Sequence, residues 1–258
     1  MQYLNAMVVV AMIILPLSPF AQSNTALIEK GRNLFNDSRL SASGLHSCAS
    51  CHPMNGHTDN KTYVGLEVVS DGDPRGRNTP TLWGADHRLA PWSWAGTTPT
   101  LEASIRGNIV GRMKGAEPTR EIVAALAAYT RSLPYGPAPL LDENGVPQIT
   151  APAAVKRGYA LFSGKAGCTN CHEPPSYDSK GVDDVGSGGT FKAPSLRSVG
   201  KTAPYFHDGR YKTLGEAVNA MSYGAVTLMT DAYRKKTGVA DRLSNAEKLD
   251  IVAFLEAL

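Results

Sequence analysis

Two copies of the pattern Cys-x-x-Cys-His constrain the fold of this chain more than any other feature. The copies are Cys48-Ala-Ser-Cys51-His52 and Cys168-Thr-Asn-Cys171-His172, and they use all four cysteines of the chain. In c-type haem attachment, two thiols with this spacing add to the haem vinyl groups, and the histidine takes the proximal position on the iron. The sequence therefore predicts two covalently bound haems c, one on each motif.

Zinc binding and thiol redox chemistry are the two alternative functions of a Cys-x-x-Cys pair. The two pairs of a zinc ribbon are usually separated by about 15–20 residues, whereas Cys48 and Cys168 lie about 120 residues apart. A thioredoxin-like motif needs a βαβ context, and neither pair has one. Haem attachment is the interpretation that also explains the histidine after each pair.

The N-terminal segment has the features of an export signal. Residues 1–19 contain no acidic or basic side chain, and residues 6–15 form an apolar run of ten. Such a run is too short to span a bilayer comfortably, but it has the length of a signal-peptide core. Small residues at Ala21 and Ser23 offer a cleavage site. We expect a signal peptide over residues 1–23 and a periplasmic protein; a retained membrane anchor and a buried helix are the alternatives.

An internal repeat divides the remaining chain. Each part starts with a helical Gly-x-x-Leu-Phe segment, at Gly31 and again at Gly158. A Cys-x-x-Cys-His motif and a long loop rich in Gly and Pro follow. Each part ends with a segment of helical periodicity, at residues 121–129 and 247–255. We expect the first and last helices of each part to cross.

The predicted fold is all-α, with two cytochrome c-like haem domains in tandem and long loops. The N-terminal haem domain spans residues 24–133, and the C-terminal haem domain spans residues 153–258. The proline-rich residues 134–152 are the predicted linker. No convincing strand pattern is visible. The haem supplies much of the apolar core that domains of this size otherwise lack.

With these motifs in place, the chain resembles the bacterial dihaem cytochrome c peroxidase/MauG family. The segment Thr202-Ala-Pro-Tyr-Phe-His-Asp-Gly-Arg210 carries the resemblance in the second domain. In the first domain it is carried by Arg39-Leu-Ser-x-Ser-Gly, Thr58-Asp-Asn60 and Arg77-Asn-Thr-Pro80-Thr. The resemblance covers nearly the whole mature chain.

The resemblance implies roles for two residues in electron transfer. Met221 matches the axial methionine of the electron-accepting haem, although a packing methionine is the alternative. MauG-like enzymes use a tyrosine in that role, so Met221 favours the peroxidase side of the family. Trp94 matches the tryptophan between the two haems.

The resemblance also implies a calcium ion between the two domains. Asn78 matches a calcium ligand of the family, with the main-chain carbonyls of Thr202 and Pro204 as partners. Calcium prefers oxygen ligands. A loop-capping amide is the alternative role for Asn78.

The chain departs from the peroxidase pattern around the first haem. Residues 62–76 contain no histidine where the family has a distal one. The family's distal glutamate falls on Ala103, and Glu102 would point about 100° away on a helix. General acid–base catalysis typically contributes 10²–10⁴-fold, so we expect weak peroxidase activity.

The sequence leaves several candidates for the sixth ligand of the first haem iron. Met113 is the first candidate, and a packing methionine is the alternative. Three histidines are further candidates: His46, His57 and His87. His207 is expected at the domain interface.

The function predicted from these features is that of a periplasmic dihaem cytochrome c peroxidase. Electrons pass from a donor through the Met221 haem to the first haem, where hydrogen peroxide is reduced. A dedicated electron-transfer protein without catalysis and a MauG-like oxidase are the alternatives. The resemblance implies a small soluble donor, such as a cytochrome c or a cupredoxin, and a homodimer is a further possibility. The mild net charge of +3 gives no indication of nucleic-acid binding.

Overall fold

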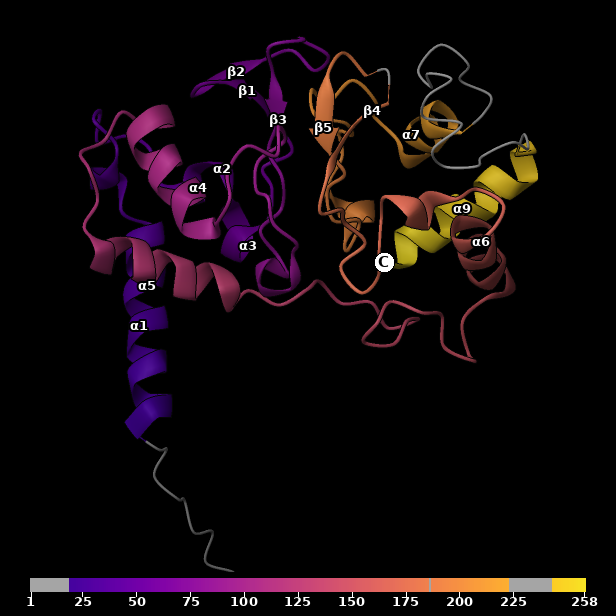
Figure 1. Ribbon diagram of the computed structural model, residues 1–258, viewed down its shortest axis with the longest axis horizontal. Coiled ribbons are helices and arrows are strands. Elements are labelled where there is room, and N and C mark those ends of the chain that lie inside the picture. Colours follow the sequence, from indigo (N-terminus) through magenta and orange to yellow (C-terminus); the bar gives the residue numbers. More distant parts are fainter. Residues whose placement is uncertain (1–18, 186, 223–242) are drawn as a thin grey trace, which may run out of the picture.

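The computed structural model describes residues 19–185, 187–222 and 243–258. These residues form two halves that lie side by side (Figure 1). We call residues 19–133 the first half and residues 153–258 the second half. The intervening segment runs from α5 to α6 and connects them (Figure 1).

The first half contains five helices and three short strands among its described residues. They are α1 (Pro19–Phe35), α2 (Cys48–Cys51), α3 (Pro53–Gly56), β1 (Thr62–Val64), β2 (Glu67–Val69), β3 (Arg77–Asn78), α4 (Leu101–Gly107) and α5 (Arg120–Arg131). A π-helical turn, Asn108–Arg112, continues α4. Single 3₁₀ turns lie at Ser38–Leu40 and Ala85–His87.

The described residues of the second half repeat this order of helices around short strands. They are α6 (Ala153–Ser163), β4 (Val182–Asp184), β5 (Thr190–Lys192), α7 (Leu214–Met221) and α9 (Asn245–Ala257). Its 3₁₀ turns lie at Cys168–Asn170 and Val199–Lys201.

A pair of crossing helices builds each half, as the repeat predicts. Helix α1 packs on α5, and α6 packs on α9 (Figure 1). Gly31 lies at the first crossing, where a Cβ atom would be only 2.0 Å from the carbonyl oxygen of Ala125. Gly158 lies at the second, where a Cβ atom would be 1.9 Å from the carbonyl oxygen of Asp250. The glycine of each Gly-x-x-Leu-Phe segment therefore allows the two backbones to touch.

The two halves have separate apolar cores. Phe35, Ile109, Leu126, Tyr129 and Leu133 form the core of the first half. The core of the second half is larger and includes Phe162, Tyr177, Val218, Ile251 and Phe254, among others. In both cores, side chains from the two crossing helices meet.

Two small antiparallel sheets correct the expectation of a fold without strands. One sheet has the order β2-β1-β3, and the other pairs β4 with β5. Each strand is two or three residues long. An alternating pattern of apolar and polar residues cannot be recognised over so few positions. The fold is helical, with these sheets placed inside the long loops.

Main-chain hydrogen bonds join the two halves near the sheets. The amide of Asn78, in β3, donates to the carbonyl of His207 at 2.7 Å. The amide of Lys192, in β5, donates to the carbonyl of Trp94 at 2.9 Å. The loop after β2 adds a bond from the amide of Gly72 to the carbonyl of Asp208, also at 2.7 Å. The junction is therefore built from backbone of both halves.

The expected signal peptide lies mostly outside the described residues. Residues 1–18 are not described, and the expected cleavage site at Ala21 and Ser23 falls in the first turns of α1. No helix among the described residues is both long and apolar enough to cross a membrane.

Candidate functional site

The second Cys-x-x-Cys-His motif forms a tight turn. The amide of His172 donates to the carbonyl of Cys168 at 2.9 Å, which folds the motif into one helical turn. Nδ1 of His172 lies 2.9 Å from the carbonyl oxygen of Tyr177. A carbonyl can only accept, so Nδ1 carries the proton, and in this tautomer the lone pair of Nε2 can ligate a metal. Burial lowers the pKa of His172, which keeps the imidazole neutral.

This motif opens into a cavity in the second half. The cavity has a volume of about 240 Å³. Its wall includes Cys168, Cys171 and His172, together with Leu214 and Met221 from α7 and Ile251 and Leu255 from α9. The structure therefore brings Met221 to the same cavity as both thiols and the imidazole. A mostly apolar wall with a nitrogen and a sulfur ligand is the environment that a His/Met haem requires.

Helix α7 is fixed at its start, which determines where Met221 lies. The hydroxyl of Thr213 accepts from the amide of Glu216 at 3.2 Å, and the carboxylate of Glu216 accepts from the amide of Thr213 at 2.9 Å. This reciprocal capping box satisfies two free backbone donors and sets the first turn of the helix. Met221 is the last residue of α7.

The first motif has the same local geometry. The amide of His52 donates to the carbonyl of Cys48 at 2.9 Å, and its Nδ1 lies 3.1 Å from the carbonyl oxygen of His57. As in the second motif, the ring bonds to a carbonyl five residues later, and Nε2 is left free. Burial lowers the pKa of His52 to about 4 and raises that of Cys48 to about 12. Cys48 packs against the apolar core of the first half. The donor set of this motif fits haem c as well.

Met113 follows the π-helical turn and is 7% exposed. Its carbonyl accepts from the amide of Ala42 at 3.1 Å, which ties the turn to the chain just before the first motif. The positive charge of the neighbouring Arg112 contributes to the lowered pKa of His52. These facts place the turn close to the first motif, while ligation by Met113 stays a prediction.

The histidines considered as alternative ligands have other surroundings. His57 is buried; its Nδ1 lies 2.9 Å from Oγ1 of Thr81, and its Nε2 lies 3.2 Å from the carbonyl oxygen of Lys201. Both ring nitrogens are therefore engaged, and His57 connects the two halves instead of offering a ligand. His87 is exposed and stacks on Tyr135 with ring centroids 5.1 Å apart. His46 is half-buried.

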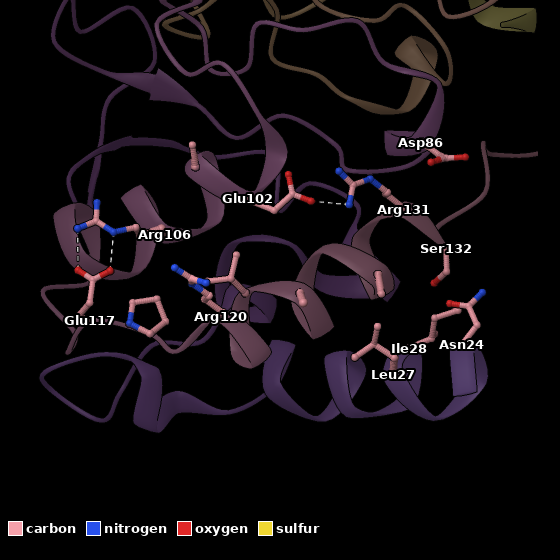
Figure 2. A pocket seen from close by; sticks show the side chains of 15 residues that line it. Asn24, Leu27, Ile28, Asp86, Glu102, Arg106, Glu117, Arg120, Arg131 and Ser132 are labelled. Carbon is pink, nitrogen blue, oxygen red and sulfur yellow. Dashed lines mark hydrogen bonds and ion pairs between the residues drawn. The ribbon is translucent and has the colours of Figure 1, made fainter. Parts of the chain in front are cut away.

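Ala103, the position of the family's distal glutamate according to the resemblance, lies in α4. It lines an open pocket of about 810 Å³ bounded by α1, α4 and α5. Figure 2 shows this pocket, with Leu27 and Ile28 of α1 on one side. Glu102 also lines it and pairs with Arg131 at 2.6 Å. None of the residues of the first Cys-x-x-Cys-His motif is part of this wall. A carboxylate at position 103 would line this pocket.

The residues predicted between the domains come together at the junction. Nε1 of Trp94 donates to the carbonyl oxygen of Asn78 at 2.8 Å, and the Trp94 ring meets His207 edge-on at a centroid distance of 6.5 Å. Trp94, Asn78, Thr202, Pro204 and His207 all line the cavity of the second half. His207 therefore lies at the interface, as expected.

The side-chain amide of Asn78 is oriented toward Pro204. Its Nδ2 donates to the carbonyl of Pro204, and its buried Oδ1 has no hydrogen-bond partner among the described residues. The oxygen and nitrogen of an amide exchange places by a simple flip. After a flip, Oδ1 would face the Pro204 carbonyl, and two oxygens facing each other are compatible with a cation between them.

Three charged residues at the junction were not anticipated from the sequence. They are Arg88, Asp178 and Lys192. Nζ of Lys192 and Oδ2 of Asp178 form a buried ion pair at 2.9 Å. Arg88 lines the cavity of the second half although it belongs to the first. None of the three stands in a recognisable motif, so no sequence signal could have identified them.

Comparison with known proteins agrees with this geometry. The model of the di-haem cytochrome c peroxidase family matches residues 25–135, and the cytochrome c model matches residues 155–258. The methylamine utilization protein MauG of Methylorubrum extorquens is 33% identical over 302 residues, which cover 93% of this chain and 81% of that protein. The cytochrome c551 peroxidase of Nitrosomonas europaea is 29% identical, with 94% and 83% covered.

A solved structure shares the fold. A MauG-like protein associated with microbial copper homeostasis superposes with a TM-score of 0.69 at 24% identity, over 94% of this chain and 89% of that one. The two family models, the relatives and the two haem-attachment motifs agree. The chain belongs to the dihaem cytochrome c peroxidase/MauG family.

Proposed function

We propose that this chain is a periplasmic dihaem c-type cytochrome that reduces hydrogen peroxide with electrons from a small soluble donor. The observation that carries the proposal is the cavity that Cys168, Cys171, His172 and Met221 line together. A methionine in this place suits a haem that accepts electrons. Relatives named as cytochrome c peroxidases support the reaction.

The side chains of the chain have distinct roles in this proposal. Cys48 and Cys51 hold one haem, and Cys168 and Cys171 hold the other. His52 and His172 ligate the irons through Nε2, because their Nδ1 atoms are held by carbonyl groups. Met221 ligates the second iron, and Met113 is the proposed ligand of the first. The bound haems supply electron transfer and the reduction of peroxide.

Trp94 is the proposed contact between the two haem sites. Trp94 belongs to the first half but lines the second cavity. Its Nε1 donates to the carbonyl of Asn78, which is also in the first half. Two hydrogen bonds, one through Nε1 and one through its carbonyl to Lys192, fix the residue from both sides. A fixed aromatic ring at the junction suits electron transfer between the halves.

A calcium ion at the junction is part of the proposal. Asn78, Thr202 and Pro204 line one wall, and the unpartnered Oδ1 of Asn78 supports a cation there. The ion would connect a residue of the first half to carbonyl groups of the second.

The proposed domains are residues 24–133 and 153–258 in tandem, with residues 134–152 as linker after a signal peptide of residues 1–23. The crossing helix pair and separate core of each half support this division. A cytochrome c or a cupredoxin is the proposed donor, and a homodimer is the proposed assembly.

Two measurements on the purified mature protein test the function. Intact mass should exceed the mass of the polypeptide by two haems. A steady-state assay should show peroxide-dependent oxidation of a reduced small cytochrome. Two attached haems with no such oxidation would favour the dedicated electron-transfer protein instead.

A MauG-like oxidase that modifies a partner protein is the second candidate. The 33% identity to a MauG protein favours it, whereas the place of Met221 in the second cavity favours the peroxidase. Peroxide-driven oxidation of a protein substrate, with no turnover of a reduced cytochrome, would favour the oxidase.

A further inference from the structure

A group of buried donors without partners lies at the junction of the two halves. These atoms are Nε of Arg88, the hydroxyl of Tyr135, and Nε and Nη1 of Arg197. None has a hydrogen-bond partner among the described residues. An unsatisfied buried donor costs about 1–3 kcal/mol, and more when it is charged. Such atoms indicate a missing acceptor.

Arg88 reaches from one half into the cavity of the other. It follows the 3₁₀ turn Ala85–His87 of the first half, and its Nη2 donates to the carbonyl of Trp83 at 3.0 Å. Its side chain nevertheless lines the cavity that also contains His172 and Met221. The unpartnered Nε therefore belongs to a side chain at the wall of the second haem site.

The charge of Arg88 lacks a counter-charge of its own. Asp178 is the nearest carboxylate that acts on it, but Asp178 already accepts from Nζ of Lys192 at 2.9 Å and from the amide of Leu89 at 3.0 Å. The positive charges of Arg197 and Arg88 both act on Tyr135, and the guanidinium of Arg197 lies over the Tyr135 ring at 4.4 Å. The single carboxylate of Asp178 therefore has to compensate the positive charges of both Arg88 and Lys192.

Burial lowers the pKa of Arg88, but an arginine stays protonated in proteins. Arg88 is half-buried, and a positive charge whose buried Nε has no partner among the described residues favours an anion beside it. A haem carries two propionate carboxylates, and these are the anions that would enter this cavity with it.

We propose that Arg88 is a positioning residue for the haem of the second half, that its free Nε donates to a propionate of that haem, and that its charge raises the haem's reduction potential. The proposal rests on the proposed function, because it needs a haem attached at Cys168 and Cys171. The ferric form carries one more positive charge than the ferrous form. A nearby cation therefore disfavours the ferric form.

The test is a spectroelectrochemical titration of both haems in the full holoprotein. Arg88→Gln should raise the ferric-to-ferrous ratio of the Met221 haem about tenfold at a fixed potential, which is about 59 mV for one electron. Arg88→Lys keeps the charge and should change the ratio less than threefold. Arg120→Gln, an exposed arginine on α5, is the matched control and should leave both haems unchanged.

The pH dependence of the reduction potential distinguishes a direct contact between Arg88 and a propionate from an electrostatic effect of the Arg88 charge at a distance. Without Arg88 the propionate loses its cation, its pKa rises, and the potential of Arg88→Gln should vary with pH near neutrality. A potential that falls equally at all pH values overturns the contact. An unchanged potential, or an equal fall in Arg120→Gln, overturns the whole inference.

Failure of the proposed function would look different. A chain that carries no covalent haem, or a haem protein without peroxide turnover, contradicts that proposal by mass or by assay alone. If Arg88→Gln does not take up haem, Arg88→Met, which also removes the charge, takes its place. A potential of the Met221 haem lower than in Arg88→Lys supports the inference, and an equal potential in the two variants overturns it.

Discussion

At the scale of single residues, the two methionines near the motifs have different surroundings. Met221 lines the second cavity with His172, and Met113 does not. Met221→Ala should therefore abolish the sulfur-to-iron charge-transfer band of the second haem and lower its potential. Met113→Ala is the matched control, and the second haem should keep its band. An unchanged spectrum and potential in Met221→Ala would mean that Met221 only packs against the haem.

Ala103 gives a second prediction for a single residue, based on the open pocket that it lines. Its side chain lines the outer pocket together with Arg106 and Arg131 (Figure 2). A carboxylate in Ala103→Glu should pair with these arginines and leave the rate of peroxide turnover within about twofold of its original value, because a surface ion pair contributes about 0–1 kcal/mol. A tenfold or larger increase in the steady-state assay would show that position 103 faces the first haem after all.

His207 makes the stability of the junction depend on pH. It is 3% exposed and stacks on Phe191, and burial lowers its pKa to about 4, with Asp208 acting in the opposite direction. An unfolded histidine titrates near 6.5. Between these values the unfolded chain binds more protons, so the free energy of unfolding should fall as pH drops from about 6.5 to about 4. Denaturant unfolding at several pH values measures this slope, and His207→Gln should reduce it.

At the scale of elements, the helix crossings give the clearest prediction. Gly31→Ala places a Cβ atom 2.0 Å from the carbonyl oxygen of Ala125, so α1 and α5 must move apart. Overpacking costs about 1–3 kcal/mol, which exceeds the roughly 1 kcal/mol that alanine gains over glycine in a helix. Gly107→Ala in α4 is the matched control, because no atom lies within 4 Å of its Cβ position. Thermal unfolding should show a lower midpoint only for Gly31→Ala.

The same elements show how far the sequence alone could predict the fold. The crossing helices were predictable, because the Gly-x-x-Leu-Phe segment occurs twice and the last helices have apolar periodicity. The strands were not, because two or three residues such as Arg77–Asn78 carry no period. The orientation of Ala103 was not predictable either. It depends on how α4 packs on α5, and no alignment of motifs fixes the rotation of a helix.

At the scale of the whole molecule, the junction between the halves contains most of what the sequence did not show. Motifs predicted Asn78, Trp94, Thr202 and Pro204, and all four line the second cavity. Arg88 joins them from a loop without a motif. The contacts of Arg88 with the second half form only in the folded molecule. The residues beside Arg88 in the sequence give no indication of these contacts.

The calcium site is the prediction that belongs to this scale, because the ion would join the two halves. A ligand at a hundred times its dissociation constant adds about 2.7 kcal/mol to the free energy of unfolding. For a chain of this size that is a rise of about 5–10 °C in Tm. Calcium should therefore raise the Tm of the chelator-treated protein.

The rise should disappear in Asn78→Ala, which removes the unpartnered Oδ1. Asn36→Ala is the matched control, because Asn36 is exposed and its side chain donates to the carbonyl of Arg32 at the end of α1. A Tm that does not respond to calcium in the original protein would contradict the site. An equal response in Asn78→Ala would place the ion elsewhere. Either result would leave the junction held by its main-chain hydrogen bonds, of which that from Asn78 to His207 survives the alanine substitution.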